Sequence, residues 1–454
     1  MRSVRLPFSV LAASCLFASL SAAEQWPDGS RIDESLLEDK AVDVTALGRE
    51  YRLDVNYIFP DGETHTREIQ DLIDRASSSG GGVIVVPPGV YRTGSLFFRP
   101  KVNLRLLEGA VLQGSDNPND YPIVDTRIES KTRKFVAALI NAENCDGFTV
   151  VGPGTIDGNG YRSWISALRR LQWCPTASNL DGQRARILYV AHSKGVRVEN
   201  VRLQNPQFWT QHYWDCDDLR LVDVRVYSPT GPKGHVKSCT DGLDLDETRN
   251  VLVRRCSFTC YDDGIALKSN DGNPVGNLLI EDCAFGRCHG ALVLGSEARH
   301  VRNVLMRRCR VESSSRILWI KFRNDMAQHY EYVTVEDVSG TVERFFFARQ
   351  FSDSRDLKGL PEGVTREMMR SRADHFTMRR CQVECREFFH MSISPLDGQL
   401  SDFVFADLNV RGENIDYDRS KIERCAFDNV QLEKIAWTGA RNTLAPIIRP
   451  SSRD

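Results

Sequence analysis

Residues 251–260 are VLVRRCSFTC, residues 278–287 are LLIEDCAFGR and residues 304–313 are VLMRRCRVES. In each segment apolar residues alternate with charged or polar ones, and a cysteine occupies the sixth position. An alternation with a period of two is typical of a strand that buries one face. Because the string returns at nearly even intervals, the sequence predicts a stack of similar short strands.

The repeat extends in both directions from these segments. Its other units begin at Val196, Leu219, Val333, Phe376 and Phe403, and most starts lie 23 to 32 residues apart. A unit of this size cannot bury a face alone, so the units are expected to stack into a solenoid. We therefore predict an all-β fold, a parallel β-helix, and expect this single domain to span residues 24–454.

The sixth position of each unit is filled by a small apolar residue or a cysteine. A position that recurs in this way suits an interior ladder, so we expect these cysteines to be buried thiols that behave as small hydrophobes: Cys256, Cys283, Cys309 and Cys381. Their spacing matches no zinc pattern. We predict no metal and no cofactor.

Before the regular repeats the pattern is looser. Short strand-like runs occur at residues 82–85, 103–107, 148–151 and 187–190. One helix is expected ahead of them, because apolar residues follow helical spacing and Gly80 to Gly82 end the run; these residues are Ile69, Leu72, Ile73 and Ala76. We predict that this helix caps the solenoid and protects its first edge. A charged stretch, residues 352–373, is predicted to be a loop insertion.

The first 23 residues have the features of an export signal. Arg2 and Arg5 precede an apolar run, and Ser21 to Ala23 are small residues suited to cleavage. We predict a signal peptide over residues 1–23 and a periplasmic or extracellular protein; attachment of a lipid at Cys15 is an alternative. The net charge of −2 suggests neither a nucleic-acid partner nor a membrane partner. No later run is long enough to span a membrane, and a monomer is expected.

Chemistry-bearing residues fall on successive predicted coils. Asp241 lies in one coil, Asp262 and Asp263 in the next, His289 in the third and Lys321 in the fourth. Residues one coil apart in a stacked solenoid are about 5 Å apart, so these side chains can form one patch. Carboxylates held close together separate their pKa values, which suits the acid and base of glycoside hydrolysis. In contrast, Asp244 and Asp246 alternate with leucines and are expected to face solvent.

Residues 53–345 resemble glycoside hydrolase family 28, the polygalacturonase and rhamnogalacturonase group. The similarity rests on the coil elements above and on earlier strings, which are VVPPGVYRTGSLFF from Val85, LRLLEGAVLQGSDNPNDYP from Leu104, GTIDGNG from Gly154, residues 186–188 and LQNPQFWTQH from Leu203. The resemblance implies a right-handed parallel β-helix and hydrolysis with inversion. It implies that Asp262 is the general acid, that Asp241 and Asp263 hold and deprotonate water, that His289 supports the acid, and that Lys321 binds substrate.

The sequence departs from the family pattern beside each element. Cys239 replaces an asparagine, Tyr261 and Cys288 replace glycines, and Trp319 replaces a substrate-binding arginine. We expect Trp319 to offer a flat face on which a sugar can stack. Arg323 or Arg316 is expected to replace the lost charge, and Lys268 is a further candidate for binding substrate.

These features predict a hydrolase that cuts galacturonate-containing bonds in pectin-type polysaccharides. A rhamnogalacturonan or an oligosaccharide, cut from within or from the chain end, is an alternative substrate. A pectate lyase and a non-catalytic carbohydrate-binding solenoid are alternatives from other functional classes. Three cysteines lie near the aspartates in the sequence: Cys239, Cys260 and Cys288. Two further hypotheses are that they form a disulfide or that one of them acts as a nucleophile.

Overall fold

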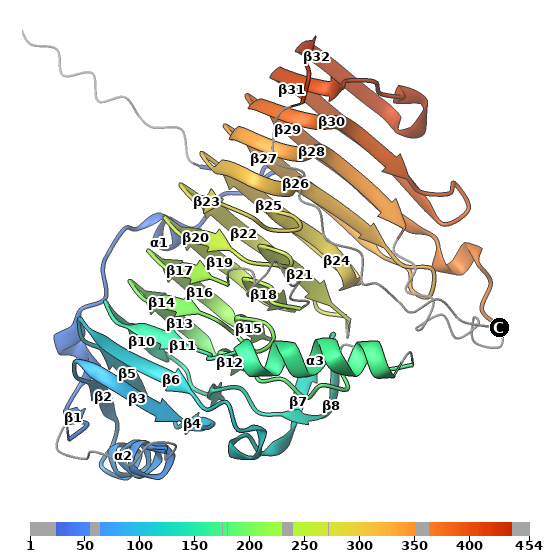
Figure 1. Cartoon of the computed structure of the whole chain (residues 1–454). Helices are drawn as coiled ribbons and strands as arrows, with labels where there is room; N and C mark the ends of the chain where they lie inside the picture. Colours follow the sequence, from blue (N-terminus) through green and yellow to red (C-terminus); the bar gives the residue numbers. More distant parts are fainter. Residues whose placement is uncertain are drawn as a thin grey trace, which may run out of the picture.

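The structure is a computed structural model that describes residues 24–54, 64–174, 176–178, 180–228, 239–270, 272–350 and 363–437. The predicted signal peptide lies outside the described residues. The chain forms a parallel β-helix, as the repeat predicted, whose coils stack along one axis from α2 at one end to β32 at the other (Figure 1). None of the helices in the described ranges is long and apolar enough to cross a membrane.

The coils place their strands in three columns. The first column holds β4 (Leu96–Phe98), β9 (Ile140–Glu143), β12 (Leu188–Ala191), β15 (Gln211–Trp214), β18 (Leu243–Asp246), β21 (Ile265–Ser269), β24 (Leu292–Ala298) and the later parts of β26 (Arg310–Phe322), β28 (Ser339–Gln350) and β30 (Gln382–Ser392). Neighbouring strands run parallel in register, so equivalent residues of successive coils lie side by side.

The second and third columns complete each coil. The second holds β1 (Glu50–Arg52), β2 (Gly82–Val86), β5 (Val102–Leu106), β10 (Thr149–Val151), β13 (Lys194–Glu199), β16 (Asp217–Val222), β19 (Arg249–Arg254), β22 (Val275–Glu281), β25 (His300–Arg307), β27 (His329–Glu336), β29 (Ser371–Arg379) and the start of β31 (Gly398–Asn414). The third holds β3 (Gly89–Thr93), β6 (Ala110–Gly114), β11 (Thr155–Asp157), β14 (Arg202–Gln204), β17 (Arg225–Tyr227), β20 (Ser257–Thr259), β23 (Ala284–Phe285), the early parts of β26, β28 and β30, and the ends of β31 and β32 (Glu423–Lys434). The start of β32 pairs with the start of β31 and continues the second column.

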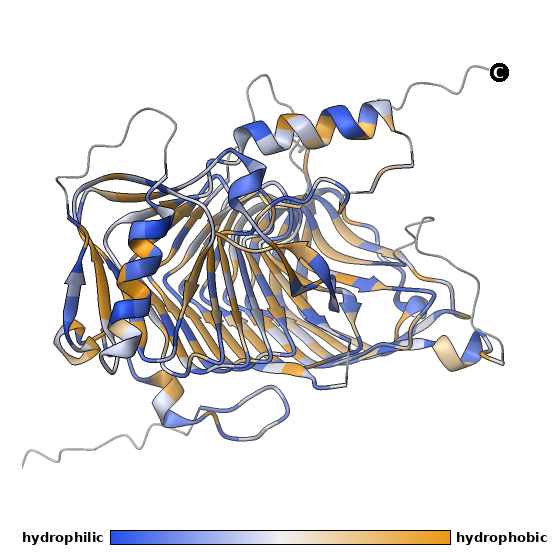
Figure 2. Cartoon of the chain, turned by 90° about the horizontal axis from the view of Figure 1, so that it is seen from below, coloured by the Kyte–Doolittle hydropathy of each residue, from blue (hydrophilic) through white to orange (hydrophobic). Residues whose placement is uncertain are grey.

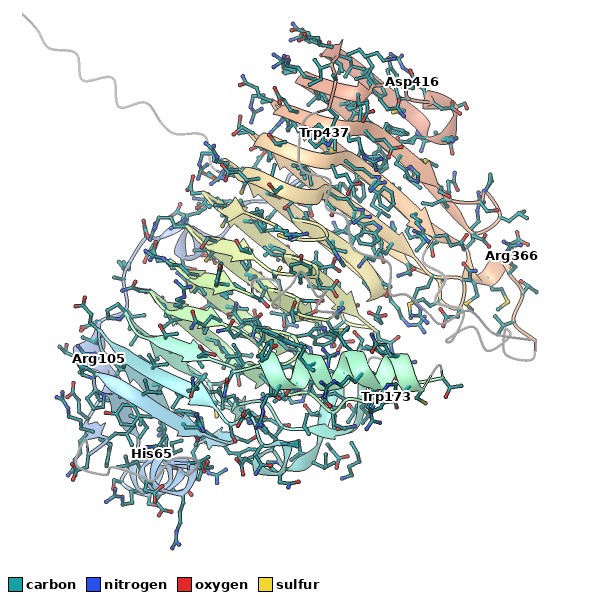
Figure 3. The ribbon with its side chains drawn as sticks, viewed as in Figure 1. His65, Arg105, Trp173, Arg366, Asp416 and Trp437 are labelled. Carbon is teal, nitrogen blue, oxygen red and sulfur yellow. The ribbon has the colours of Figure 1, made fainter. Side chains whose placement is uncertain are left out.

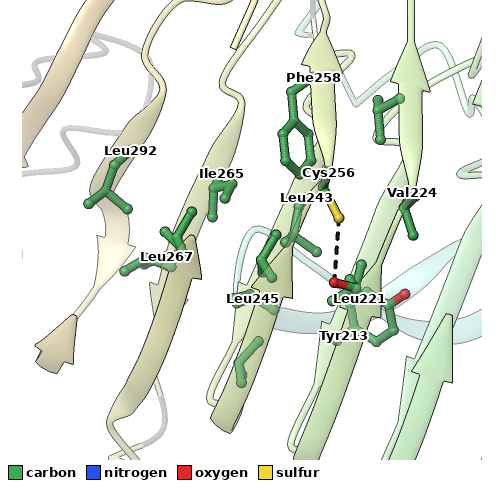
Figure 4. Close-up of a cluster of buried hydrophobic side chains, with 14 of the residues drawn as sticks. Tyr213, Leu221, Val224, Leu243, Leu245, Cys256, Phe258, Ile265, Leu267 and Leu292 are labelled. Carbon is green, nitrogen blue, oxygen red and sulfur yellow. Dashed lines mark hydrogen bonds between the residues drawn. The ribbon is translucent and has the colours of Figure 1, made fainter. Parts of the chain in front are cut away.

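The core fills the space between the columns. Apolar and polar residues alternate along the strands (Figure 2), and the apolar ones point inward. Leu245 of β18 stacks between Tyr213 and Leu267 of the adjacent coils, and all three are buried (Figure 4). Each fully buried side chain of this kind stabilises the fold by about 1.5–3 kcal/mol.

The predicted cysteine ladder is confirmed. Its four members are buried, and the Cys256 thiol donates to the carbonyl of Leu221 in the preceding coil at 3.4 Å (Figure 4). Burial raises the pKa of the Cys283 and Cys309 thiols well above the usual value. These thiols therefore stay neutral and serve as core residues.

The predicted capping helix is α2 (Thr66–Ser78), which packs on β2, β4 and β5. Its buried residues are the four that the spacing predicted, and Gly80 to Gly82 adopt positive φ where the helix turns into β2. A Cβ on Gly82 would lie 2.4 Å from the carbonyl oxygen of Arg49, so the entry into the first coil needs glycine.

Further elements lie outside the columns. They include α1 (Glu34–Leu37), the single turns η1 (Val44–Leu47), η2 (Pro118–Asp120), η4 (Glu367–Met369) and η5 (Arg419–Lys421), and α3 (Tyr161–Trp173). The N-terminal segment buries Trp26, Ile32 and Leu36 on an outward ladder of leucines from β19, β22 and β25. Trp173 stands at the far end of α3 and is 81% exposed (Figure 3).

The repeat resumes earlier than predicted. We expected the loop insertion to end at Ala373, but β29 begins at Ser371, and η4 precedes it. Ala373 is buried and pairs with Tyr330 of β27, because the register of the second column demands an inward apolar residue there. Residues 351–362 of the insertion lie outside the described part of the chain.

Candidate active site

The predicted aspartates lie at one edge of the first column. Asp241 precedes β18, Asp262 and Asp263 precede β21, and His289 precedes β24. Backbone bonds continue the strand ladder through these segments: Gly242 N donates to the Asp263 carbonyl at 2.9 Å, and His289 N donates to the Asp262 carbonyl at 2.8 Å. The stacking therefore brings together residues that are far apart in the sequence, as predicted.

Gly242 and Gly264 allow the coils to approach at this edge. A Cβ on Gly242 would lie 2.7 Å from the Gly264 carbonyl oxygen and 2.7 Å from the Phe258 ring. A Cβ on Gly264 would lie 3.1 Å from the Gly290 carbonyl oxygen. Larger residues would push the coils apart, so these glycines keep the acidic side chains within reach of one another.

Asp262 is the most accessible of the three aspartates. One of its oxygens accepts the backbone N–H of Cys239 at 2.8 Å, and the other contacts Nδ1 of His289 at 3.0 Å. Burial alone would raise the pKa of Asp262, but the imidazole of His289 outweighs it and brings the pKa well below its usual value. In the free protein, Asp262 is therefore ionised.

Asp263 is buried and bonded to Lys321. Nζ of Lys321 donates to one carboxylate oxygen of Asp263 at 2.6 Å, and the other oxygen is buried without a hydrogen-bond partner. This second oxygen is a free acceptor at the centre of the cluster, a place where a water can be held. Lys321 thus binds a carboxylate of the cluster, whereas the family resemblance implies that it binds substrate.

Asp241 is buried beside the same group. Burial and the charge of Asp244 raise the pKa of Asp241 well above its usual value. Asp241 is therefore the carboxyl of the cluster that most readily keeps a proton, while Asp262 is ionised. The pKa values of the acids are separated in the way that the sequence predicted, but the protonated member differs from the one that the resemblance implies.

The prediction that Asp244 and Asp246 face solvent is wrong. Both side chains are completely buried, and both lie on β18. Asp244 lies 3.5 Å from Nζ of Lys268, and burial raises its pKa to about 7. The outward face of the first column is covered here, so an outward side chain is not an exposed one.

The cover is a hairpin of β7 (Ile123–Ile128) and β8 (Lys131–Val136). Its turn residues Glu129 and Ser130 both adopt positive φ, as a two-residue hairpin turn requires. At its tip, the Ser130 hydroxyl donates to the carbonyl of Glu297 at the end of β24. The hairpin therefore crosses the first column and reaches the coil that carries His289.

Two buried arginines fasten this hairpin. Nε of Arg127 donates to Asp246 at 3.0 Å, and Arg186 donates to Thr126 at 2.6 Å and contacts His212 at 2.7 Å. The sequence did not identify Arg127 as a site residue, because it lies outside the repeat. The alternation of polar and apolar residues over 123–136 was the one indication of strands there. Together these contacts close the cluster on one side.

The remaining candidates for substrate binding are engaged by protein groups. Lys268 lies 3.4 Å from Glu297, and Arg323 donates to Asp325 at 2.6 Å. Trp319 is only 8% exposed, and its ring is covered by Arg316, whose Cζ is 4.0 Å from the ring centroid, and by Lys321 at 3.9 Å. The expectation that Trp319 offers a face for sugar stacking is therefore wrong, because cations already occupy that ring.

The cysteines near the aspartates are free thiols. Cys239, Cys260 and Cys288 form no disulfide. Burial raises the pKa of Cys239 to about 12, so its thiolate is disfavoured and a nucleophilic role gains no support.

Two groups of side chains have the ligand types of a cation site. Asp262, Asp263 and His289 bring one ligand atom each within 4.8 Å of one another, as do three residues on β25 and β27, which are His300, His329 and Glu331. In both groups the acids are already paired with histidine, lysine or arginine.

The geometry agrees with what comparisons of the sequence find. The family model described as Glycosyl hydrolases family 28 matches residues 121–341, which include all of the clustered residues. Over these residues, just under half of the chain, the sequence is similar to this family. The chain is 27% identical over 276 residues to an exo-poly-alpha-D-galacturonosidase of Dickeya chrysanthemi, a match that covers 52% of this chain and 46% of that protein.

Other similar proteins also carry the name polygalacturonase. An endo-polygalacturonase of Pectobacterium carotovorum subsp. carotovorum is 25% identical over 260 residues, which covers 54% of this chain and 61% of that protein. The chain thus spans about half the length of the curated relatives it matches. The solved exopolygalacturonase of Thermotoga maritima superposes with a TM-score of 0.66 at 20% identity, covering 88% of this chain and 95% of that one. This likeness shows the shared β-helix fold.

Proposed function

We propose that the protein is an exported glycoside hydrolase that cuts galacturonate-containing bonds of pectin-type polysaccharides with inversion. The observation that carries the proposal is the cluster of Asp241, Asp262 and Asp263 with His289 and Lys321. The names of the family 28 relatives support galacturonate as the sugar.

The proposed mechanism divides the work among the carboxyls. Asp262 faces the accessible side of the cluster and protonates the leaving oxygen, with His289 as the source of its proton through their 3.0 Å contact. Asp263 presents its unbonded oxygen to a water, and its ionised form removes the proton of that water as the water attacks the sugar. Asp241 holds the same water. Lys321 holds Asp263 in place through its charge-assisted hydrogen bond.

One experiment tests the class of reaction. The protein is incubated with homogalacturonan, and reducing ends, ultraviolet absorbance and the anomer of the first product are followed. Hydrolysis with inversion gives reducing ends of inverted configuration and no absorbing product. Unsaturated products would instead favour a lyase, and binding without new reducing ends would favour a non-catalytic solenoid.

A matched variant controls for folding. Asp215→Asn removes the acid of another aspartate–histidine pair, in which His192 Nδ1 lies 2.8 Å from Asp215 at the opposite edge of the first column. This variant should keep normal turnover, while Asp263→Asn should lose most of it. Equal activity in both variants would remove the cluster from the reaction.

The hairpin favours cleavage from a chain end, which is the second candidate function. It covers β18 beside Asp241, so a polymer meets protein on that side of the cluster. Comparing the loss of viscosity of a galacturonan solution with the release of reducing ends distinguishes the two modes. A steep early loss of viscosity would show cleavage within the chain.

A further inference from the structure

Arg316 differs from the other cations around the aspartates. It lies on β26, and its Nη1 donates to the backbone carbonyl of His289 at 2.9 Å. Across the described residues, no acidic side chain lies within ion-pairing distance of Arg316. Its Nε is also buried without a hydrogen-bond partner. A guanidinium that is partly withdrawn from water and unpaired is costly, so an anionic ligand would stabilise it.

The neighbouring cations are already neutralised. Lys321 is bonded to Asp263, Lys268 lies between two acids, and Arg344 donates to Glu387 at 2.8 Å. An ionised galacturonate that approaches three aspartates would be repelled unless a cation offsets its charge. Arg316 is a cation at this edge with which no acid in the described part of the chain forms an ion pair.

Aromatic rings hold the guanidinium where an acid usually would. Its Cζ lies 4.0 Å from the ring centroid of Trp319 and 4.5 Å from that of Phe347. The two rings meet edge to face at 5.5 Å, so they form a rigid corner. Cation–π contacts orient a guanidinium without neutralising it, which leaves its charge available. Burial and the charge of Arg344 lower the pKa of Arg316 to about 10, so the group is still a cation at neutral pH.

We propose that Arg316 binds the carboxylate of the galacturonate next to the bond that is cut, and that Trp319 and Phe347 position its guanidinium. The proposal rests on the proposed function and names its specificity-determining residue. It assigns to Trp319 the role of a platform for the arginine instead of a surface for the sugar.

The test measures binding, so it does not depend on turnover. Trigalacturonate and its fully methyl-esterified form are titrated into the wild-type protein and into Arg316→Gln by calorimetry. Loss of one charge-assisted bond should weaken binding of the free acid about 10- to 100-fold and leave the ester within about 2-fold. Arg310→Gln is the control, because Arg310 lies exposed on the same strand and pairs with Glu312. This variant should bind both ligands as the wild type does.

The outcomes separate this inference from the proposed function. Equal weakening of acid and ester in Arg316→Gln, or no weakening, would overturn the role of Arg316, as would a wild type that binds neither ligand. Arg316-dependent binding without hydrolysis would keep the inference and overturn the proposed function. Thermal unfolding of Arg316→Gln checks that the His289 segment keeps its structure, and Arg316→Lys should restore part of the binding, because it keeps the charge and loses the planar contact.

Discussion

Replacing Asp262 or Asp241 with asparagine identifies the proton donor of the proposed reaction. Asp262 is accessible but ionised in the free protein, whereas Asp241 keeps a proton but is buried. We expect Asp262 to be the donor, because the acid must touch the leaving oxygen and because His289 can return the proton across 3.0 Å. Asparagine at position 262 can still accept the Cys239 N–H, so the fold should persist.

The size of the effect follows from the chemistry of proton transfer. A positioned general acid contributes about 10²- to 10⁴-fold, or about 3–5 kcal/mol of barrier. The contribution depends on the leaving group: a sugar alkoxide needs the proton, and an aryl oxide does not. Asp262→Asn should therefore lose about 10²- to 10⁴-fold in kcat on oligogalacturonides and less than about 10-fold on an aryl galacturonide.

The assay compares both substrates in both variants. Asp241→Asn should lose turnover on either substrate, because a group that holds water is needed whatever leaves. If instead Asp241→Asn is rescued by the aryl substrate and Asp262→Asn is not, the roles are exchanged, and the raised pKa of Asp241 identifies the acid better than the accessibility of Asp262. Parallel losses in both variants would show that neither is the acid.

Three other changes probe the frame around the cluster. Arg127→Ala leaves Asp246 buried without its cation and should lower the free energy of unfolding by about 3–5 kcal/mol, seen as a lower urea midpoint; an unchanged midpoint would contradict the role of the hairpin pair. Burial raises the pKa of Asp244 from its ordinary 3.8 to about 7. The neutral carboxyl therefore makes its full contribution to the free energy of unfolding below pH 3.8, and this contribution is lost as the pH rises through about 7. Asp244→Asn should therefore flatten the fall in thermal midpoint between about pH 4 and pH 7, and an equally steep fall would speak against this pKa. A thiol reagent should label Cys174 long before Cys283, because Cys174 is exposed and its pKa is lowered by its contact with Thr176, whereas Cys283 is buried. Mass spectrometry under native conditions measures both labelling rates, and similar rates would show that the core opens.

The sequence predicted the fold because the repeat itself is the fold. A period of two within a unit and a regular return of Cys256, Cys283 and Cys309 determine which side chains enter the core. The same regularity placed Asp241, Asp262 and His289 at one edge without any contact information. These predictions needed only local alternation and stacking, which are both visible in one dimension.

What failed depended on segments that lie outside the repeat. Asp244 and Asp246 point outward on β18, as their alternation implies, but the β7–β8 hairpin covers them. The alternation predicts whether a side chain points inward or outward. Whether an outward side chain is exposed to solvent depends on the path of residues 123–136. The same limit applies to Trp319, which also points outward and is then covered by Arg316.

The proposed role of Arg316 explains how a stacked fold can accept tryptophan at position 319. Arg316 and Trp319 lie on the same strand of one coil, and the strand turns between columns just ahead of Arg316. The guanidinium of Arg316 donates to the backbone carbonyl of His289 and lies over the ring of Trp319. The guanidinium of Arg316 therefore reaches the edge that carries His289. Replacing an arginine with tryptophan removes one cation from the column, and the new ring then supplies the surface that holds the other. The three aspartates, which depend on register with their neighbours, have no such freedom, and they are the residues that this chain retains.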